Sequence, residues 1–465
     1  MKQSILLNVD AYKVSMWKMM PPNTEAVYSY IESRGGKYDE TVFFGLQAFI
    51  QEYLTDPITA QDIDEAEIIW NSNGQIFNRD NWEYILEEHN GYLPVVIKSV
   101  TEGSVVPVNN VLATIENTDP NCYWLTTWLE TALLRAIWYP TTVASQGYRI
   151  KRYIKYALEM TSDIDILQYT LHDFGMRGVS SNESAIIGGM AHLVNFAGTD
   201  TISGVLGAKR YYDTTITNTS AIASEHSVIV SWGKENESDA YRNIIKGFYG
   251  KIVSIVSDSY DIYNACRNIY GKELKDDIIN MQGFLVIRPD SGNPVDIICG
   301  TSSLLPKDDV QKGIVRILDE QFGSTVNKKG YKVLNHVRIL QGDGIDEHTI
   351  LHILKELIDI GYSAENILFG MGGQNLQKVD RDTQKFAMKC SSIRVDGTWR
   401  DVKKDPITDL GKRSKAGRVT LYKTNGVYHS GVEDWEKPVL QTVFEDGKAF
   451  NRITFDEVRK NTGLW

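Results

Sequence analysis

Four short apolar runs in the second half of the chain restrict the possible folds most. Each run ends in a polar loop that contains Gly or Asp, and stretches with helical spacing separate the runs, which are KIVSIVSDSYD (251–261), GFLVIRPDSGNP (283–294), HVRILQGDGID (336–346) and NILFGMGGQN (366–375). Strands that alternate with helices are typical of βα units around a parallel sheet. Ligands of such folds bind at the carboxyl ends of the strands. The polar residues after each run are therefore candidates for chemistry, and the apolar residues within it are candidates for the core.

Other parts of the chain have helical patterns. Residues 60–72 and 349–360 are predicted to form amphipathic helices, the second with Gly361 as its stop, and the Trp-, Tyr-, Leu- and Ala-rich stretch 121–160 is predicted to be mostly buried helix. A length of 465 residues suggests about three domains, or two where one of them is a barrel.

The charge balance argues against a nucleic-acid partner. There are 49 basic and 60 acidic residues, so the formal net charge is −11, and an acidic surface repels phosphate backbones. Any anionic ligand therefore has to meet a local group of cations. The stretch KKDPITDLGKRSKAGR (403–418) is one such group, although a charge run of this kind is also typical of a solvated loop.

The cysteines and the N-terminus indicate a cytoplasmic protein. Four cysteines are widely spaced without a C-x-x-C pair, so the sequence signals neither a disulfide framework nor a zinc site. The N-terminal MKQSILLNVDAYK has a three-residue apolar run, shorter than a secretory signal requires. Since no segment approaches the roughly 18 apolar residues of a membrane span, we expect a soluble protein without a membrane partner.

The loop FGMGGQN is a candidate phosphate site. Gly370, Gly372 and Gly373 carry no side chains, so their backbone N–H groups can approach an anion closely. In (β/α) barrels a phosphate site commonly forms from late strand–loop units, and this is a late unit. A tight turn is the alternative. Arg381 and Lys389 follow closely and favour the anion site.

Three further loops carry charged residues after an apolar run. In IRPDSG, Arg288 and Asp290 are two residues apart in extended backbone and so point the same way, which suits a ligand with both phosphate and hydroxyl groups. A structural ion pair is the alternative. Asp343 lies between glycines in QGDG, where a turn is an equally natural explanation, and Asp258 ends another run.

The segment LHDFGMRGVSS (171–181) is the densest cluster of functional groups. His172, Asp173 and Arg177 surround Phe174, an arrangement that could stack a flat ring and hold an anion, or could be a capped helix start with a core phenylalanine. His226, in ASEHS, is one of eight histidines. It could be a structural group, and the adjacent Glu225 could either orient it or be exposed.

Together these segments resemble the nicotinamide phosphoribosyltransferase family over nearly the whole chain. The tracts that carry the resemblance are DAYKVSMWKMMPPNTEAVYSYIESR (10–34), ETVFFGLQ (40–47), ENTDPNCYWLTTWLET (116–131), LHDFGMRGVSS, HLVNFAGTDT (192–201), SEHS (224–227), SDSYDIYNAC (257–266), IRPDSGNP (287–294), QGDGID (341–346) and KRSKAGR (412–418). So many long tracts in the same order distinguish this family from nicotinate and quinolinate relatives, which share the architecture.

The resemblance implies an α/β fold with two domains. One is the irregular (β/α) barrel of the type II phosphoribosyltransferases, and the other is an α/β domain built from the N- and C-terminal segments. We expect an N-terminal α/β and helical region at 1–160, a barrel-like catalytic domain at 161–375 and a C-terminal segment, 376–465, that completes the first domain. The family also implies a homodimer with shared active sites.

The resemblance assigns the ring contacts to three residues. Phe174 and Tyr12 match the pair that sandwiches the pyridine ring, with Tyr12 supplied by the partner subunit. Asp200 matches the acceptor for the carboxamide NH₂. A carboxylate at this position attracts an amide donor and repels the carboxylate of nicotinic acid, so one residue can set the choice of substrate.

Other residues match the family's contacts to the ribose, the phosphates and the pocket behind the ring. Arg177, His226 and Arg288 match pyrophosphate contacts, and Ser220 and Ser254 match the lining of the tunnel behind the ring. The matching nucleotide contacts are Arg288, Asp290, Gly342, Asp343, Gly372, Gly373 and Arg381, with Asp258 beside the substrate and with Arg34, Lys389, Lys404 and Lys412 around the phosphate end. Met176, Met371, Gln374 and Ala387 depart from the usual residues of the family.

The implied reaction joins nicotinamide to phosphoribosyl pyrophosphate and releases nicotinamide mononucleotide and pyrophosphate, a step of NAD salvage. Asp200, Arg288, Asp290 and His226 are the expected catalytic residues, with Mg²⁺ accompanying the pyrophosphate. His226 also matches the family's phosphorylatable histidine, which implies stimulation by ATP. A nicotinate phosphoribosyltransferase and a non-catalytic ligand-binding homologue are the alternatives; a barrel phosphoesterase lacks clustered metal-ligand spacing.

Overall fold

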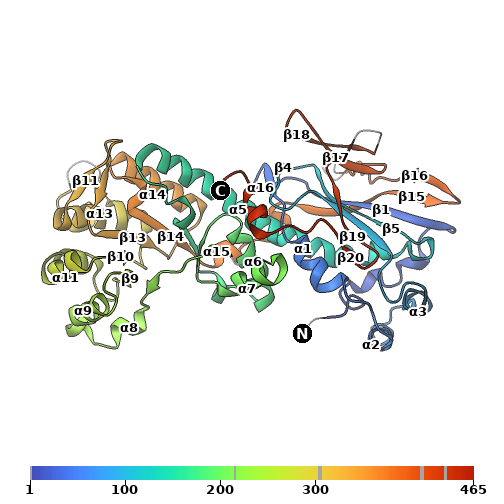
Figure 1. Cartoon of the computed structure of the whole chain (residues 1–465), viewed down its shortest axis with the longest axis horizontal. Helices are drawn as coiled ribbons and strands as arrows, with labels where there is room; N and C mark the ends of the chain where they lie inside the picture. The colour runs from blue at the N-terminus through green and yellow to red at the C-terminus, as the bar shows by residue number, and fades with distance from the viewer. Residues whose placement is uncertain (1–2, 214–215, 302–305, 409–412, 434–436) are drawn as a thin grey trace. The chain divides into compact units, whose positions relative to one another are not determined.

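The computed structural model describes residues 3–213, 216–301, 306–408, 413–433 and 437–465. The chain divides into two compact units (Figure 1): unit 1 comprises Met1–Ser145, Gly207–Ile216 and Val379–Trp465, and unit 2 comprises Gln146–Leu206 and Thr217–Lys378. These bounds differ from the predicted domains at 146–160, 207–216 and 376–378. Lys412, predicted to lie near the phosphate end, is outside the described residues.

Unit 2 is built on a parallel sheet with the strand order β7-β6-β14-β13-β10-β9-β8. The strands are β6 (Leu171–Asp173), β7 (Gly198–Thr199), β8 (Ile222–Ala223), β9 (Ile252–Val256), β10 (Phe284–Arg288), β13 (Val337–Gln341) and β14 (Ile367–Met371). Thr219 bridges to Gly198 of β7, and β8 begins three residues later and pairs with β9. Residues 219–223 thus pair with β7 at one edge of the sheet and with β9 near the other edge. The sheet therefore curls into an irregular barrel, as predicted.

The four apolar runs of the sequence are the strands β9, β10, β13 and β14. Helices separate them in the chain, including α11 (Lys275–Asn280), α13 (Asp309–Phe322) and α14 (Glu347–Asp359), and α9 (Glu237–Gly247) precedes β9; Figure 1 shows these helices outside the strands. The helix predicted at 349–360 is α14, and Gly361 follows it with a φ of +84°. The βα prediction for this part of the chain is therefore confirmed.

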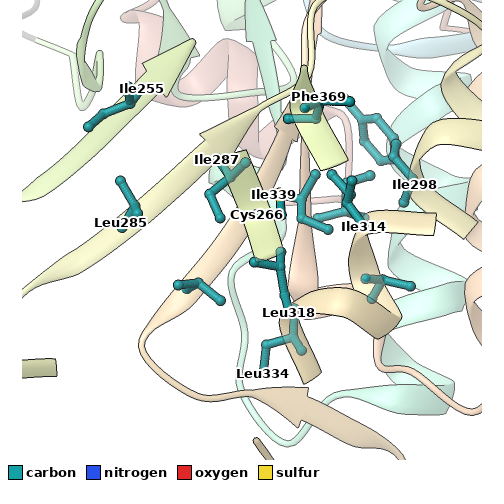
Figure 2. Close-up of a cluster of buried hydrophobic side chains, with 14 of the residues drawn as sticks. Ile255, Cys266, Leu285, Ile287, Ile298, Ile314, Leu318, Leu334, Ile339 and Phe369 are labelled. Carbon is teal, nitrogen blue, oxygen red and sulfur yellow. The ribbon is translucent and has the colours of Figure 1, made fainter. Parts of the chain in front are cut away.

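Side chains from the strands and the surrounding helices form the core of unit 2 (Figure 2). Ile255, Leu285, Ile287, Ile339 and Phe369 of the strands are buried together with Ile298, Ile314 and Leu318 of the helices. Burial of each such side chain stabilises the fold by about 1.5–3 kcal/mol. Since both faces of a parallel sheet are covered, its strands are continuous apolar runs, which is why the sequence shows no period of two here.

Unit 1 contains an antiparallel sheet that joins the two ends of the chain. Its strand order is β16-β15-β1-β5-β3-β19-β20, and Figure 1 shows β1, β5 and β15 side by side. The N-terminal strands are β1 (Thr24–Ser33), β3 (Val95–Ser99) and β5 (Val111–Asn117), and the C-terminal strands are β15 (Phe386–Val395), β16 (Thr398–Asp401), β19 (Gln441–Glu445) and β20 (Lys448–Ala449). The predicted second domain from N- and C-terminal segments is therefore confirmed.

Helices complete unit 1. The helix predicted at 60–72 is α2 (Ala60–Ser72), and a capping box between Thr59 and Asp62 fixes its start. The stretch predicted as buried helix contains η4 (Pro120–Cys122), α4 (Leu125–Trp128) and the long helix α5 (Glu130–Thr161). Within the described ranges, no helix combines the length and apolar character needed to cross a membrane.

Candidate active site

The carboxyl ends of the unit 2 strands bring most of the predicted site residues to one edge of the sheet. Neighbouring strands are in parallel register, with Arg288 opposite Val256, Gln341 opposite Phe369 and Met371 opposite Asp173. The residues that follow the strand ends are Phe174 after β6, Asp200 after β7, His226 after β8, Asp258 after β9, Asp290 after β10, Asp343 after β13, and Gly372 and Gly373 after β14.

Phe174 packs against backbone that two glycines leave open. A Cβ atom on Gly370 would lie 2.0 Å from Cε2 of Phe174, and a Cβ atom on Gly342 would lie 3.2 Å from the same carbon. The guanidinium carbon of Arg288 is 5.6 Å from the centre of the Phe174 ring. Phe174 is half-buried. The turn therefore holds a half-buried aromatic ring at the strand ends, and its stacking on a flat ligand stays a prediction.

Arg288 and Asp290 form a two-point ion pair. Nη2 of Arg288 lies 2.7 Å from Oδ2 of Asp290, and Nε lies 3.1 Å from Oδ1. A Cβ atom on Gly342 would come within 3.2 Å of Asp290 Oδ1, so the glycine leaves room for the pair. The structural ion pair considered above is thus present. A ligand phosphate would compete with Asp290 for the guanidinium, which prefers two-point contacts with either oxyanion.

His226 is oriented by Asp258. Its Nε2 atom is 3.0 Å from Oδ1 of Asp258, whose side chain is 6% exposed, whereas the His226 side chain is 47% exposed. His226 begins the short helix α8 (His226–Val230). Glu225 instead accepts a hydrogen bond from the hydroxyl of Ser227. Asp258 therefore orients His226, and Glu225 is exposed.

Asp200 and Ser220 meet beside β7. The hydroxyl of Ser220 donates to Oδ1 of Asp200 at 2.5 Å, and the backbone N–H of Asp200 donates to the carbonyl of Asp173 at 2.9 Å. Asp200 also acts on the nearby His172. Burial lowers the pKa of His172, and the negative charge of Asp200 opposes that shift.

Several buried polar atoms inside unit 2 have no hydrogen-bond partner among the described residues. They are Ser254 Oγ, Gln341 Oε1, His172 Nδ1 and Asp173 Oδ2. Ser254 lies on β9, where it was predicted to line the space behind the ring. Since buried polar atoms are usually satisfied by protein, water or ligand, each of these atoms has capacity for a further hydrogen bond.

The glycine loop adjoins the turn that carries Arg177. Arg177 lies in η6 (Met176–Gly178) and is exposed. A Cβ atom on Gly178 would lie 3.3 Å from Cα of Gly373, so the two loops touch. Nothing lies within 4 Å of a Cβ atom placed on Gly373, and the short helix α15 (Gly373–Leu376) starts there. The Gly373 backbone is therefore open on its Cβ side, where an anion could approach it.

The remaining predicted site residues lie in unit 1. Tyr12 is 64% exposed in η1 (Ala11–Lys13), and Arg381, which is 54% exposed, pairs with Asp382. Lys404 is exposed and Arg34 is half-buried. Burial lowers the pKa of Lys389; Glu130 opposes this shift, and the cations Arg34, Lys404 and Lys13 add to it.

These cations form a cluster whose charge is only partly neutralised. Glu32, buried in β1, pairs with Arg34 at 3.1 Å and with Lys415, whereas Nη2 of Arg34 is buried without a partner among the described residues. Lys13 is also buried and pairs with Glu130 at 2.6 Å. Lys13 and Glu32 leave no signal in the sequence, because residue type alone does not show that a charged side chain is buried.

A group of possible metal ligands occurs elsewhere in unit 1. Ligand atoms of His89, Asp119 and Cys122 lie within 4.8 Å of one another. Oδ2 of Asp119 is already engaged, since it accepts from the Tyr84 hydroxyl at 2.9 Å and contacts His89 Nε2 at 2.8 Å. Burial raises the pKa of the Cys122 thiol to about 12, which disfavours the thiolate. The group is therefore a satisfied polar contact.

Comparison with solved structures identifies the fold as that of the pyridine phosphoribosyltransferases. Nicotinate-nucleotide pyrophosphorylase from Pyrococcus furiosus superposes with a TM-score of 0.60 at 17% identity, over 98% of this chain and 94% of that one. Human nicotinic acid phosphoribosyltransferase gives 0.53 at 13% identity, over 98% and 92%. Residues 169–448 match the nicotinate phosphoribosyltransferase (NAPRTase) family model.

More similar relatives narrow this class. Residues 4–97 match the model of the nicotinamide phosphoribosyltransferase N-terminal domain. A protein named nicotinamide phosphoribosyltransferase from Xanthomonas campestris is 49% identical over 98% of this chain and 97% of its own length. One of the same name from Acinetobacter baylyi is 33% identical over 97% and 95%. The chain belongs to the nicotinamide phosphoribosyltransferase family, as the resemblance predicted.

Proposed function

We propose that this protein transfers a phosphoribosyl group from phosphoribosyl pyrophosphate to nicotinamide, making nicotinamide mononucleotide and pyrophosphate for NAD biosynthesis by salvage. The 49% identity to the Xanthomonas campestris relative over nearly the whole of both chains is the observation that carries this function. The strand-end geometry of unit 2 supports it, because ring, ribose and phosphate contacts have suitable residues there.

Asp200 is proposed to select the uncharged vitamin. Ser220 donates to Oδ1 of Asp200, which leaves Oδ2 to accept from the carboxamide NH₂ of nicotinamide. Nicotinate would bring a second carboxylate to the same place, and like charges in contact cost several kcal/mol. Phe174 stacks on the pyridine ring, and Tyr12 of a second subunit would cover its other face.

The chemistry depends on stabilising the departing pyrophosphate, because the ring nitrogen of nicotinamide is a weak nucleophile. Arg177 and Arg288 are proposed to bind the pyrophosphate, and Asp290 and Asp343 the ribose hydroxyl groups. The bond from the anomeric carbon to the pyrophosphate oxygen breaks as the ring nitrogen attacks that carbon, and nearby carboxylates stabilise the positive charge that develops on the ribose. The backbone N–H groups of Gly372 and Gly373 are proposed to hold the 5′-phosphate.

A magnesium ion fits the donors of this edge. Carboxylate oxygens there belong to Asp258, which shares Oδ1 with His226, to Asp290, which is paired with Arg288, and to Asp343, and Mg²⁺ prefers oxygen ligands and phosphate. When bound with the pyrophosphate, Mg²⁺ supplies charge neutralisation. The cations Arg34, Arg381, Lys389, Lys404 and Lys412 are proposed to serve the phosphate end of the substrate.

ATP stimulation is proposed to act through His226. Asp258 accepts from Nε2–H, so Nδ1 keeps its lone pair and is the atom that would take the γ-phosphoryl group of ATP, releasing ADP. The exposure of the imidazole gives a phosphoryl donor access. A phosphohistidine would then add negative charge beside Asp258 and favour binding of Mg²⁺.

We also propose that the protein is cytoplasmic and forms a homodimer with shared sites. The ring of Tyr12 is exposed, and in such a dimer it would pack on the ligand bound by the other subunit. Mixed dimers of Tyr12→Ala and Asp200→Ala subunits test this sharing. Each variant alone is expected to keep less than half of the native activity with nicotinamide, whereas mixed dimers regain one intact site and up to half of the native activity. Failure of mixing to restore activity would contradict shared sites.

The function is tested by mixing pure protein, Mg²⁺ and phosphoribosyl pyrophosphate with nicotinamide or nicotinate at equal concentration, with and without ATP. Chromatography identifies the nucleotide. We expect nicotinamide mononucleotide in excess, and more of it with ATP. Preferential formation of the nicotinate nucleotide would identify the nicotinate-specific alternative, and no nucleotide at all would favour a ligand-binding homologue.

A further inference from the structure

A buried group of three polar side chains lies behind the strand ends of unit 2. Asp173 at the end of β6, His192 on α6 (Asn182–Leu193) and Asn375 on α15 are each no more than 1% exposed. The Nδ2 atom of Asn375 is 3.1 Å from Oδ1 of Asp173 and 3.1 Å from Nδ1 of His192. We call this group the amide node.

The contacts fix the orientation of the Asn375 amide and the tautomer of His192. Only the NH₂ end of the amide can face the Asp173 carboxylate, since the amide oxygen would meet another oxygen there. Nε2 of His192 is 2.8 Å from the carbonyl of Gly198, an acceptor, so that nitrogen carries the hydrogen. Nδ1 is then the acceptor for the second Asn375 hydrogen, and His192 is neutral.

Each member of the amide node is attached to a different part of the proposed site. Asp173 Oδ1 also accepts the Gly175 N–H at 2.8 Å, which shapes the turn that carries Phe174. His192 holds Gly198, two residues before Asp200, and Asp200 in turn donates its N–H to the carbonyl of Asp173. Asn375 donates its own N–H to the carbonyl of Gly372 at 2.9 Å, within the glycine loop.

The glycine loop needs such support from side chains. Its helix α15 has four residues, too few to be stable by itself. Gln146 donates to the carbonyls of Gln374 and Asn375 at 3.2 and 3.3 Å, which holds the backbone of α15. The Asn375 side chain links this loop directly to Asp173 of the ring turn and, through His192, to Gly198 of β7.

We propose that Asn375 is a positioning residue that fixes the phosphate loop relative to the Phe174 turn and Asp200, through Asp173 and His192. This role rests on the proposed function, which places the 5′-phosphate at the glycine loop and the pyridine ring at Phe174 and Asp200. Asn375 does not itself contact either substrate. Its amide sets the distance between the 5′-phosphate and the pyridine ring.

The first test replaces Asn375 by Leu, which keeps the volume and removes both donors. The matched control is Asn366→Leu. Asn366 is similarly buried and its side chain makes three hydrogen bonds, with Leu334, Lys332 and Ser363, against two for Asn375, but it lies at the opposite end of β14. Both variants are expected to lose stability in urea unfolding, so stability alone does not distinguish them.

Steady-state kinetics distinguish the two variants. For Asn375→Leu we expect KM to rise for both phosphoribosyl pyrophosphate and nicotinamide, with a loss of kcat/KM of about 10- to 100-fold, because misplacement near 1 Å has effects of that order. For Asn366→Leu we expect the KM values for both substrates to equal those of the native protein. A folded Asn375→Leu variant with native KM values, or equal KM changes in the control, would overturn the proposal.

A second variant is tested by the pH dependence of its kcat/KM, which a loss of stability alone would not change. Asn375→Asp keeps the size but places a carboxylate against Asp173, with His192 as the other titratable neighbour, so the node must take up a proton to keep its contacts. We expect kcat/KM of this variant to fall by about 10-fold or more relative to the native protein as pH rises from about 6 to 9. A pH profile of kcat/KM parallel to that of the native protein would refute the positioning role of Asn375.

The native protein is assayed first in every series. If it makes no nicotinamide mononucleotide, the proposed function fails and the amide node has no reaction to support. If it is active while the Asn375 variants fold and keep native KM values and a native pH profile, the positioning role alone fails.

Discussion

Substitution of Gly370 by Ala tests whether Phe174 is held in place by the backbone of β14. The added Cβ atom would lie 2.0 Å from Cε2, 2.3 Å from Cδ2 and 2.8 Å from Cζ of the ring. Gly370 has no positive φ, so an alanine backbone is unstrained and the methyl group itself is the whole perturbation. To restore an ordinary contact of about 3.4 Å, the ring has to move by roughly 1.4 Å.

The ring displacement sets the expected magnitude. Loss of aromatic stacking costs about 0.5–1.5 kcal/mol, or roughly 2- to 13-fold in affinity. Misalignment of the reacting ring nitrogen by more than about 1 Å raises the total loss of kcat/KM for nicotinamide to the order of 100-fold. The stability loss should be smaller, about 1–3 kcal/mol, because Phe174 is half-buried and can turn outward.

The assay compares initial rates at varied nicotinamide with thermal unfolding of the same sample. Gly247→Ala is the control, since Gly247 lies in unit 2 at the end of α9 and a Cβ atom there meets nothing within 4 Å. We expect native kinetics for Gly247→Ala. Native KM and kcat for nicotinamide in a folded Gly370→Ala variant would show that Phe174 does not position the ring.

Three further predictions concern charge, specificity and packing. Burial raises the pKa of Glu102 to about 7 from its ordinary 4.5. The folded protein therefore holds a proton that the unfolded chain has released between these values, and the free energy of unfolding should fall by about 3 kcal/mol as pH rises from about 4.5 to 7. Glu102→Gln should flatten that fall in urea unfolding, and an unchanged pH dependence would show that Glu102 is not its source. Asp200→Ser should narrow the preference for nicotinamide over nicotinate by about 10-fold or more, and an unchanged ratio of kcat/KM values would remove its selective role. Gly204→Ala places Cβ 2.5 Å from the Gly189 carbonyl carbon, so thermal unfolding should show a loss of about 1–3 kcal/mol; a native melting temperature would contradict this packing.

The strands of unit 2 could be predicted because their apolar runs are long and end in turn residues. The runs became β9, β10, β13 and β14 with few residues of error. By contrast, β7 and β8 have two residues each and leave no periodic signal, so only tertiary pairing reveals them. Parallel pairing of the strands then explains why loops distant in the sequence share one edge.

The site was predictable only where residue types stand beside such strand ends. Arg288 and Asp290 lie at the end of a strong run and point the same way as predicted, and the structure pairs them with each other, which was the alternative to a ligand contact. Asn375 gave no signal, since an asparagine after glycines is ordinary turn chemistry. The partner of His226 was also hidden, because Asp258 is distant in the sequence and adjacent only through the pairing of β8 with β9.

The pairing of β1 with β15 has a consequence for biosynthesis. Ser33 pairs with Phe386, so β1 has only its other neighbour, β5, until the last part of the chain emerges from the ribosome. At roughly 5–20 residues per second this interval lasts on the order of tens of seconds. Every strand of the barrel has been synthesised by Met371, before Phe386 begins β15. The barrel can therefore assemble while the first domain to be translated still waits for its closing strands.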